Sequence, residues 1–198
     1  MSLMTATMIE ELTRRYTAPD RHYHDLRHIE ALLALLDRHR DAFADPQAVE
    51  AAIWFHDAIY DSRAKDNEER SAQLAAEWLA SDTSPARLSP IVRMIEATAG
   101  HRLAEGLSGD EREDTRLFLD MDLSILGAEP ERYCAYEDEV RREYGWVDDA
   151  TWRARRADFL VAFLARDRLF STDLFRDEFE AKARRNMAAS LARLRETT

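Results

Sequence analysis

Apolar residues recur along the chain at the three- and four-residue spacing of amphipathic helices, and no run alternates with the two-residue period of a strand. Capping signals punctuate this pattern. Together they predict helices over about residues 3–16, 26–36, 46–60, 67–79, 90–99, 111–127, 130–144, 148–168 and 173–195. We therefore expect an all-α protein that folds as a compact helical bundle.

Four short signals set the expected helix boundaries. Asp45-Pro46 places an N-cap residue before a proline at the first helical position. Asp66 and Glu69 have the spacing of a capping box. Ser89-Pro90 predicts a further helix start, and Gly100 suits the position that follows the end of that helix.

One of these helices carries an adjacent histidine and aspartate, His56-Asp57, inside an otherwise apolar run. Val49, Ile53 and His56 follow the spacing of one helix face, and Asp57 borders it. Both polar side chains should therefore face the core, where an imidazole and a carboxylate without partners are costly. Either both side chains have hydrogen-bond partners within the core, or they bind a metal ion.

Two other helices offer further ligands. His28 heads an apolar stripe, whereas His24 lies one turn earlier and could also be a loop histidine that packs over the helix start. Asp122 lies within an apolar stripe, whereas Asp120 occupies a rim position that suits a surface acid or one behind the ligands. His28, His56, Asp57 and Asp122 would suit one divalent ion, Mn²⁺, Fe²⁺, Zn²⁺ or, less well, Mg²⁺, with open positions for water and a substrate oxygen.

Other residues could complete such a site. Glu68 could orient the attacking water as a catalytic residue or simply favour a helix N-terminus. His101 could bind phosphate, donate a proton or touch a second metal, or it could be an exposed loop histidine. Arg21, His24 and Lys65 are candidate substrate-binding residues, although arginines and lysines more commonly belong to the solvated surface.

Composition narrows the classes of function. The chain has 198 residues, 45% of them hydrophobic, which suits one domain spanning residues 1–198. The net charge of −11 argues against nucleic acid as a partner. The single cysteine, Cys134, excludes an intramolecular disulfide, and neither a signal peptide nor a long apolar stretch is present. We expect a cytoplasmic protein without a membrane partner, and aromatic residues such as Trp146 and Trp152 would suit a homodimer.

The ordered pattern of His28, His56-Asp57 and Asp122 resembles the HD superfamily of metal-dependent phosphohydrolases. Residues 21–29, 54–61, 66–72 and 118–127 are similar to a bacterial subgroup of predicted HD phosphohydrolases. The resemblance implies an HD-domain helical bundle with a core over about residues 16–128, on which C-terminal helices 130–198 pack. It also implies a divalent metal at the four residues and phosphomonoesterase or phosphodiesterase chemistry, often on nucleotides.

The expected function is thus a metal-dependent phosphohydrolase that acts on a small phosphorylated metabolite such as a nucleotide. One alternative is a signalling module that binds metal or nucleotide without turnover. Another is a di-iron oxygenase of the same fold. The shortage of histidines argues against two-metal members of the superfamily, because only His101 follows the His-Asp pair.

Overall fold

Every regular element of the protein is helical in the computed structural model, which describes residues 3–196. The all-α prediction is confirmed. The chain forms two compact units, one ending at Asp122 and one beginning at Leu123. The single-domain expectation stays a prediction, and the two units are described separately below.

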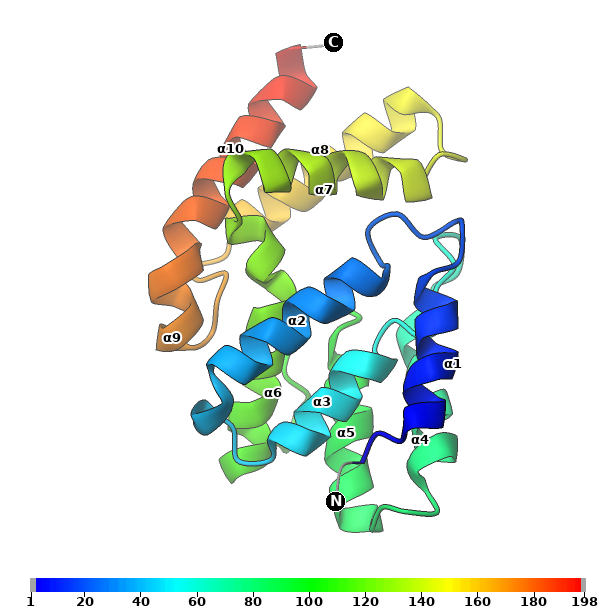
Figure 1. The fold of residues 1–198 in the computed structure, drawn as a ribbon. Helices are drawn as coiled ribbons and strands as arrows, with labels where there is room; N and C mark the ends of the chain where they lie inside the picture. Colours follow the sequence, from blue (N-terminus) through cyan, green and yellow to red (C-terminus); the bar gives the residue numbers. More distant parts are fainter. Residues whose placement is uncertain (1–2, 197–198) are drawn as a thin grey trace. The chain divides into compact units, whose positions relative to one another are not determined.

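The first unit is built around one apolar helix, α3. Its elements are α1 (Ala6–Tyr16), α2 (Leu26–Arg38), η1 (Arg40–Ala42), α3 (Pro46–Phe55), α4 (Asn67–Leu79), α5 (Pro85–Ala97) and α6 (Gly109–Asp122). Seven of the ten residues of α3 are buried, as expected for a helix whose only polar side chains are Gln47 and Glu50. Figure 1 shows α3 among α1, α2, α4, α5 and α6, all of which contact it.

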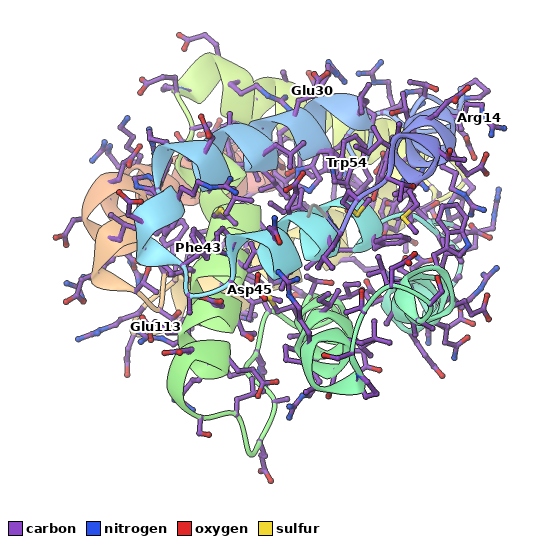
Figure 2. All side chains as sticks on the ribbon, turned by 60° about the horizontal axis from the view of Figure 1, so that its bottom comes forward. Arg14, Glu30, Phe43, Asp45, Trp54 and Glu113 are labelled. Carbon is purple, nitrogen blue, oxygen red and sulfur yellow. The ribbon has the colours of Figure 1, made fainter. Side chains whose placement is uncertain are left out.

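Helix α3 begins where the sequence predicts and ends earlier. The Asp45 side chain accepts a hydrogen bond from the Ala48 amide, and Pro46 takes the first helical position. Figure 2 labels Asp45 at this start and Trp54 near the other end of the helix. The predicted continuation to Tyr60 is wrong, because the α-helix stops at Phe55 and residues 56–60 form a turn.

Two other predicted boundaries also differ from the structure. Helix α4 follows Asp66, but the Asp66 side chain makes no capping hydrogen bond, so the predicted capping box is absent. Helix α5 begins at Pro85 rather than at Pro90, which lies inside it. Ser84-Pro85 offers the same pairing of cap and proline as Ser89-Pro90, and the earlier start adds a turn of helix.

The end of α5 departs from the expected glycine cap. Gly100 does not adopt a positive φ angle, whereas His101 does, at 47°. Helix α5 ends at Ala97 with Thr98 as its cap, and the left-handed residue of the turn that follows is His101. Among residues 3–196, no other non-glycine residue has a positive φ.

The second unit comprises the C-terminal helices. Its elements are η2 (Leu123–Gly127), α7 (Pro130–Glu143), α8 (Asp149–Leu164), α9 (Asp173–Phe175), the π-helical turn η3 (Arg176–Glu180) and α10 (Ala181–Glu196). The prediction of helices over 130–144, 148–168 and 173–195 is close, although the last is divided by the π turn. Within residues 3–196, no helix is long and apolar enough to span a membrane.

Candidate metal centre

Four of the predicted site residues lie together in the first unit. His28 is in the first turn of α2, His56 and Asp57 follow the end of α3, and Asp122 is the last residue of α6. The His28, His56 and Asp57 residues are buried, and the Asp122 side chain is 12% exposed. The structure thus brings the two imidazoles and two carboxylates to one place.

The ligand atoms face one another at short range. The Nε2 atoms of His28 and His56 are 3.1 Å apart. Asp122 Oδ1 lies 3.2 Å from His28 Nε2 and 3.8 Å from His56 Nε2. Asp57 Oδ2 lies 3.0 Å from His56 Nε2 and 3.8 Å from His28 Nε2.

These separations suit a shared cation. With bonds of about 2.1 Å, neighbouring ligands of a six-coordinate ion are about 3.0 Å apart and opposite ligands about 4.2 Å. The ligand atoms of His28, His56 and Asp122 all lie within 4.8 Å of one another. Asp57 approaches the same two imidazoles but is not part of that group of three.

The hydrogen positions also favour a cation. His56 Nδ1 lies 2.8 Å from the Ile53 carbonyl oxygen, which only accepts, so this nitrogen carries a hydrogen. In neutral His56 the Nε2 lone pair then faces the Asp57 carboxylate, and only a proton or a metal ion makes that approach favourable. A ligating histidine typically donates its other N–H to a carbonyl in this way. The residues present therefore fit a divalent ion.

The charges of the cluster shift its acid–base equilibria. Burial alone would lower the pKa of His56, but Asp57 and Asp122 outweigh it and raise that pKa to about 9. Burial would raise the pKa of Asp57, but His56 and His24 hold it below its usual range. Burial also opposes ionisation of Asp122, whose pKa is held well below the usual range by hydrogen bonds with His101 and His28. Both carboxylates are therefore ionised at neutral pH.

The turn after α3 places His56 and Asp57. Carbonyl groups at the end of α3 and in this turn, which a longer helix would bond internally, are bound by side chains from outside α3. Tyr16 donates its hydroxyl to the Trp54 carbonyl, and Arg21 donates to the carbonyls of Asp57 and Ala58. These hydrogen bonds provide partners for the carbonyl groups although the helix does not continue. Asp57 therefore lies outside the helix and is still buried.

Helix α4 fixes the end of this turn and the residue that follows it. Ser71 Oγ accepts from the Ile59 amide and donates to the Ile59 carbonyl. Asn67 accepts from the Asp61 amide and donates to the Asp61 carbonyl. We did not predict these supporting residues, since pairing a side chain with a distant main-chain group leaves no local pattern.

His101 contacts the cluster from the loop after α5. Its Nε2 lies 2.8 Å from Asp122 Oδ2, the carboxylate oxygen that does not face His28, and its side chain is 24% exposed. His101 holds this place with the left-handed backbone described above. Strained backbone of this kind concentrates at functional sites. The structure therefore brings His101, a predicted catalytic residue, to the cluster.

The other predicted residues have different surroundings. The His24 ring stacks on Tyr60, with centroids 4.2 Å apart, and lies 6.3 Å from the His28 ring. Glu68 is half-buried in the first turn of α4, and the contacts of the four cluster residues do not include it. Lys65 is exposed and is not brought to the cluster. Arg21 binds main-chain carbonyls.

Asp120 is buried, with 2% of its surface exposed. The prediction that it could be a surface acid is therefore wrong. Residues 117–121 of α6 are all buried, so this part of the helix lacks the wet face that the polar neighbours of Asp120 suggested. The alternative role, behind the ligands, stays a prediction.

A cavity of about 350 Å³ lies elsewhere in the first unit, where α3, α5 and α6 begin. None of the four cluster residues lines it. Its Asp114 accepts hydrogen bonds from the amides of Ala44 and Asp45, and its Asp45 is bound by Arg87. These acids already hold helix starts together, which explains their presence without a ligand.

Comparison of the chain with family models, with curated proteins and with solved structures finds no match.

Proposed function

We propose that the protein is a metal-dependent phosphohydrolase that acts on a small phosphorylated metabolite, with a nucleotide as the expected class. The observation that carries the proposal is the grouping of two imidazole Nε2 atoms with the Asp122 carboxylate, together with the approach of the Asp57 carboxylate to the same two nitrogen atoms. The resemblance to HD phosphohydrolases supports phosphoryl chemistry, since its ligand pattern falls on these same four residues. A divalent ion bound there would lower the pKa of a water ligand and neutralise charge on a phosphoryl group.

The residues of the chain have separate roles in this proposal. His56 keeps a fixed tautomer because Ile53 accepts its Nδ1–H, and its Nε2 is thereby directed at the ion. The carboxylate of Asp57 places negative charge beside His56. The carboxylate of Asp122 does the same beside the other imidazole. His101 binds the outer oxygen of Asp122 and is partly exposed, so its Nδ1 is the atom that can meet a substrate or donate a proton to the leaving group.

The test is a hydrolysis assay on a panel of nucleotides, phosphomonoesters and phosphodiesters, with protein loaded in turn with Mn²⁺, Fe²⁺, Zn²⁺ and Mg²⁺. Release of inorganic phosphate is followed for the nucleotides and monoesters, and release of the alcohol is followed for the diesters. A His56→Ala, Asp57→Ala double variant removes half of the cluster. A His39→Ala, Asp41→Ala double variant changes the same residue types at η1 and serves as the matched control. We expect release by the wild type and the control, and none by the cluster variant.

Other outcomes distinguish the alternatives. Metal binding without release from any panel member would favour a signalling module that binds metal or nucleotide without turnover. Two irons per chain with oxygen consumption would favour the oxygenase. A wild type that binds no metal would refute the site itself.

A further inference from the structure

Arg21 joins two segments of main chain that carry the candidate ligands. Its Nη1 donates to the carbonyls of His24, at 2.9 Å, and of Asp57, at 2.6 Å. Its Nη2 donates to the Ala58 carbonyl at 3.1 Å. One guanidinium thus links the loop that leads into α2 with the turn that follows α3.

Two aromatic rings lie beside this guanidinium. Its carbon lies 4.9 Å from the centre of the Tyr16 ring and 5.7 Å from that of Tyr60. Tyr16 is itself anchored, since its hydroxyl donates to the Trp54 carbonyl at 3.0 Å. Arg21 is therefore held by hydrogen bonds to the main chain and by contacts with both rings.

The hydrogen bonds limit what else Arg21 can bind. Both hydrogens of Nη1 and one of Nη2 are directed at carbonyl oxygens. Binding a phosphate through these atoms would release the main chain of Asp57 and Ala58. The geometry favours a structural partner of the ligands over the substrate-binding role expected from the sequence.

We propose that Arg21 is a positioning residue of the metal centre, which fixes the main chain of Asp57 so that its carboxylate is aligned for metal binding. This inference rests on the proposed metal centre. Arg21 acts through main-chain oxygens, so it supports Asp57 without competing with the metal for the carboxylate. Its positive charge also lies at the C-terminal end of α3, where the helix dipole favours a cation.

Lysine cannot replace Arg21 in this role. A guanidinium presents its hydrogens in a rigid planar fork, whereas an ammonium is a flexible point charge. Arg21→Lys therefore keeps the charge near the end of α3 and loses the three-carbonyl link. Arg21→Met keeps much of the stem and loses both.

Arg87 offers a matched control at the other end of α3. Its guanidinium also forms a two-pronged contact, with both carboxylate oxygens of Asp45 at 2.6 and 2.7 Å. It contacts none of the four cluster residues. Arg87→Met therefore removes an equivalent anchor of the same helix and leaves the centre intact.

The experiment titrates metal-free full-length protein with Co²⁺ and follows the visible absorption of the bound ion. Each variant is measured well below its own unfolding temperature. We expect Arg21→Met and Arg21→Lys to bind Co²⁺ more weakly than the wild type by about 10- to 100-fold, as for other groups that orient metal ligands. We also expect a changed band shape at saturation, since a displaced Asp57 alters the coordination. Arg87→Met should lower the unfolding temperature and keep the wild-type affinity and spectrum.

Three results would overturn the proposal. Wild-type affinity and spectrum in both Arg21 variants would refute the positioning role and leave the metal centre standing. An equal loss in Arg87→Met would show that general stability, not positioning, is responsible. A wild type that binds no Co²⁺ would refute the metal centre and the role of Arg21 with it. If Arg21→Met does not fold, Arg21→Lys carries the same comparison.

Discussion

At the scale of residues, the cluster depends on a helix that ends early. Successive side chains of an α-helix point about 100° apart. A helix that continued past His56 would therefore turn the side chain of Asp57 away from that of His56. Asp57 lies beyond α3, in a turn bound by Tyr16 and Arg21, and its direction is set by those contacts. His56 remains at the helix end, where its ring reaches back to the Ile53 carbonyl.

The left-handed backbone of His101 gives a prediction at this scale. His101→Gly and His101→Ala both remove the hydrogen bond to Asp122, but only alanine retains a Cβ at a φ of 47°. Glycine avoids that steric penalty, so the glycine variant should have the higher free energy of unfolding, by about 1 kcal/mol. Urea titration of the metal-free variants measures the difference. An alanine variant at least as stable as the glycine variant would contradict the strain at this residue.

Site residues could be predicted from the sequence where the apolar residues around them recur at helical spacing on one face of a helix. His28 and Asp122 were selected by the apolar stripes beside them, and the structure brings both to the His-Asp pair. The same reasoning failed for Asp120, because α6 is buried on nearly every side there. It also missed Tyr16 and Ser71, since their bonds to the turn join residues far apart in the chain.

At the scale of elements, α3 is anchored by side chains at both ends, Asp45 with Arg87 at its start and Tyr16 with Arg21 at its end. Helix existence could be predicted from periodicity throughout the chain. Boundaries could not always be predicted, because equivalent signals compete. Proline occurs at residues 85 and 90, and only packing of the whole turn decides between them.

The start of α3 gives a pH-dependent prediction. The hydrogen bond from Arg87 lowers the pKa of Asp45, and burial opposes this only in part. The resulting stabilisation is complete above the unfolded-state pKa and is lost as the pH falls through the lower folded-state pKa. Asp45→Asn keeps a capping side chain and loses the charge.

Urea unfolding of the wild type and Asp45→Asn checks this prediction at pH 7, 5 and 3. The wild type should be the more stable protein at pH 7, and the difference should shrink below about pH 4. A difference that stays constant over this range would mean that the Asp45 charge does not support the helix start.

The contact between η2 and η3 gives a second prediction for elements. A Cβ on Gly127 would lie 2.7 Å from both the Cβ and the carbonyl oxygen of Phe179, so the main chain would have to move. Gly127→Ala should lower the free energy of unfolding by about 1–3 kcal/mol. Gly100→Ala is the control, since nothing lies within 4 Å of its Cβ position, and it should change stability by less than about 0.5 kcal/mol. Equal effects in urea unfolding would refute the close packing at Gly127.

At the scale of the whole molecule, the candidate site belongs to one of two units. All four cluster residues and His101 lie in the unit that ends at Asp122, and Asp122 is its last residue. The all-α class followed from the sequence because helical periodicity and caps run through the entire chain. The resemblance implies that the core ends near residue 128, but nothing in the composition predicts a division after Asp122, since the chain has no long linker there.

The metal content of the purified full-length protein tests the central claim most directly. The wild type, the His56→Ala, Asp57→Ala double variant and the His39→Ala, Asp41→Ala control are dialysed against the same divalent ions. Their metal content is then measured by elemental mass spectrometry. We predict one divalent ion per chain in the wild type and in the control, and none in the cluster variant. A wild type without metal, or a cluster variant with as much metal as the wild type, would contradict the account.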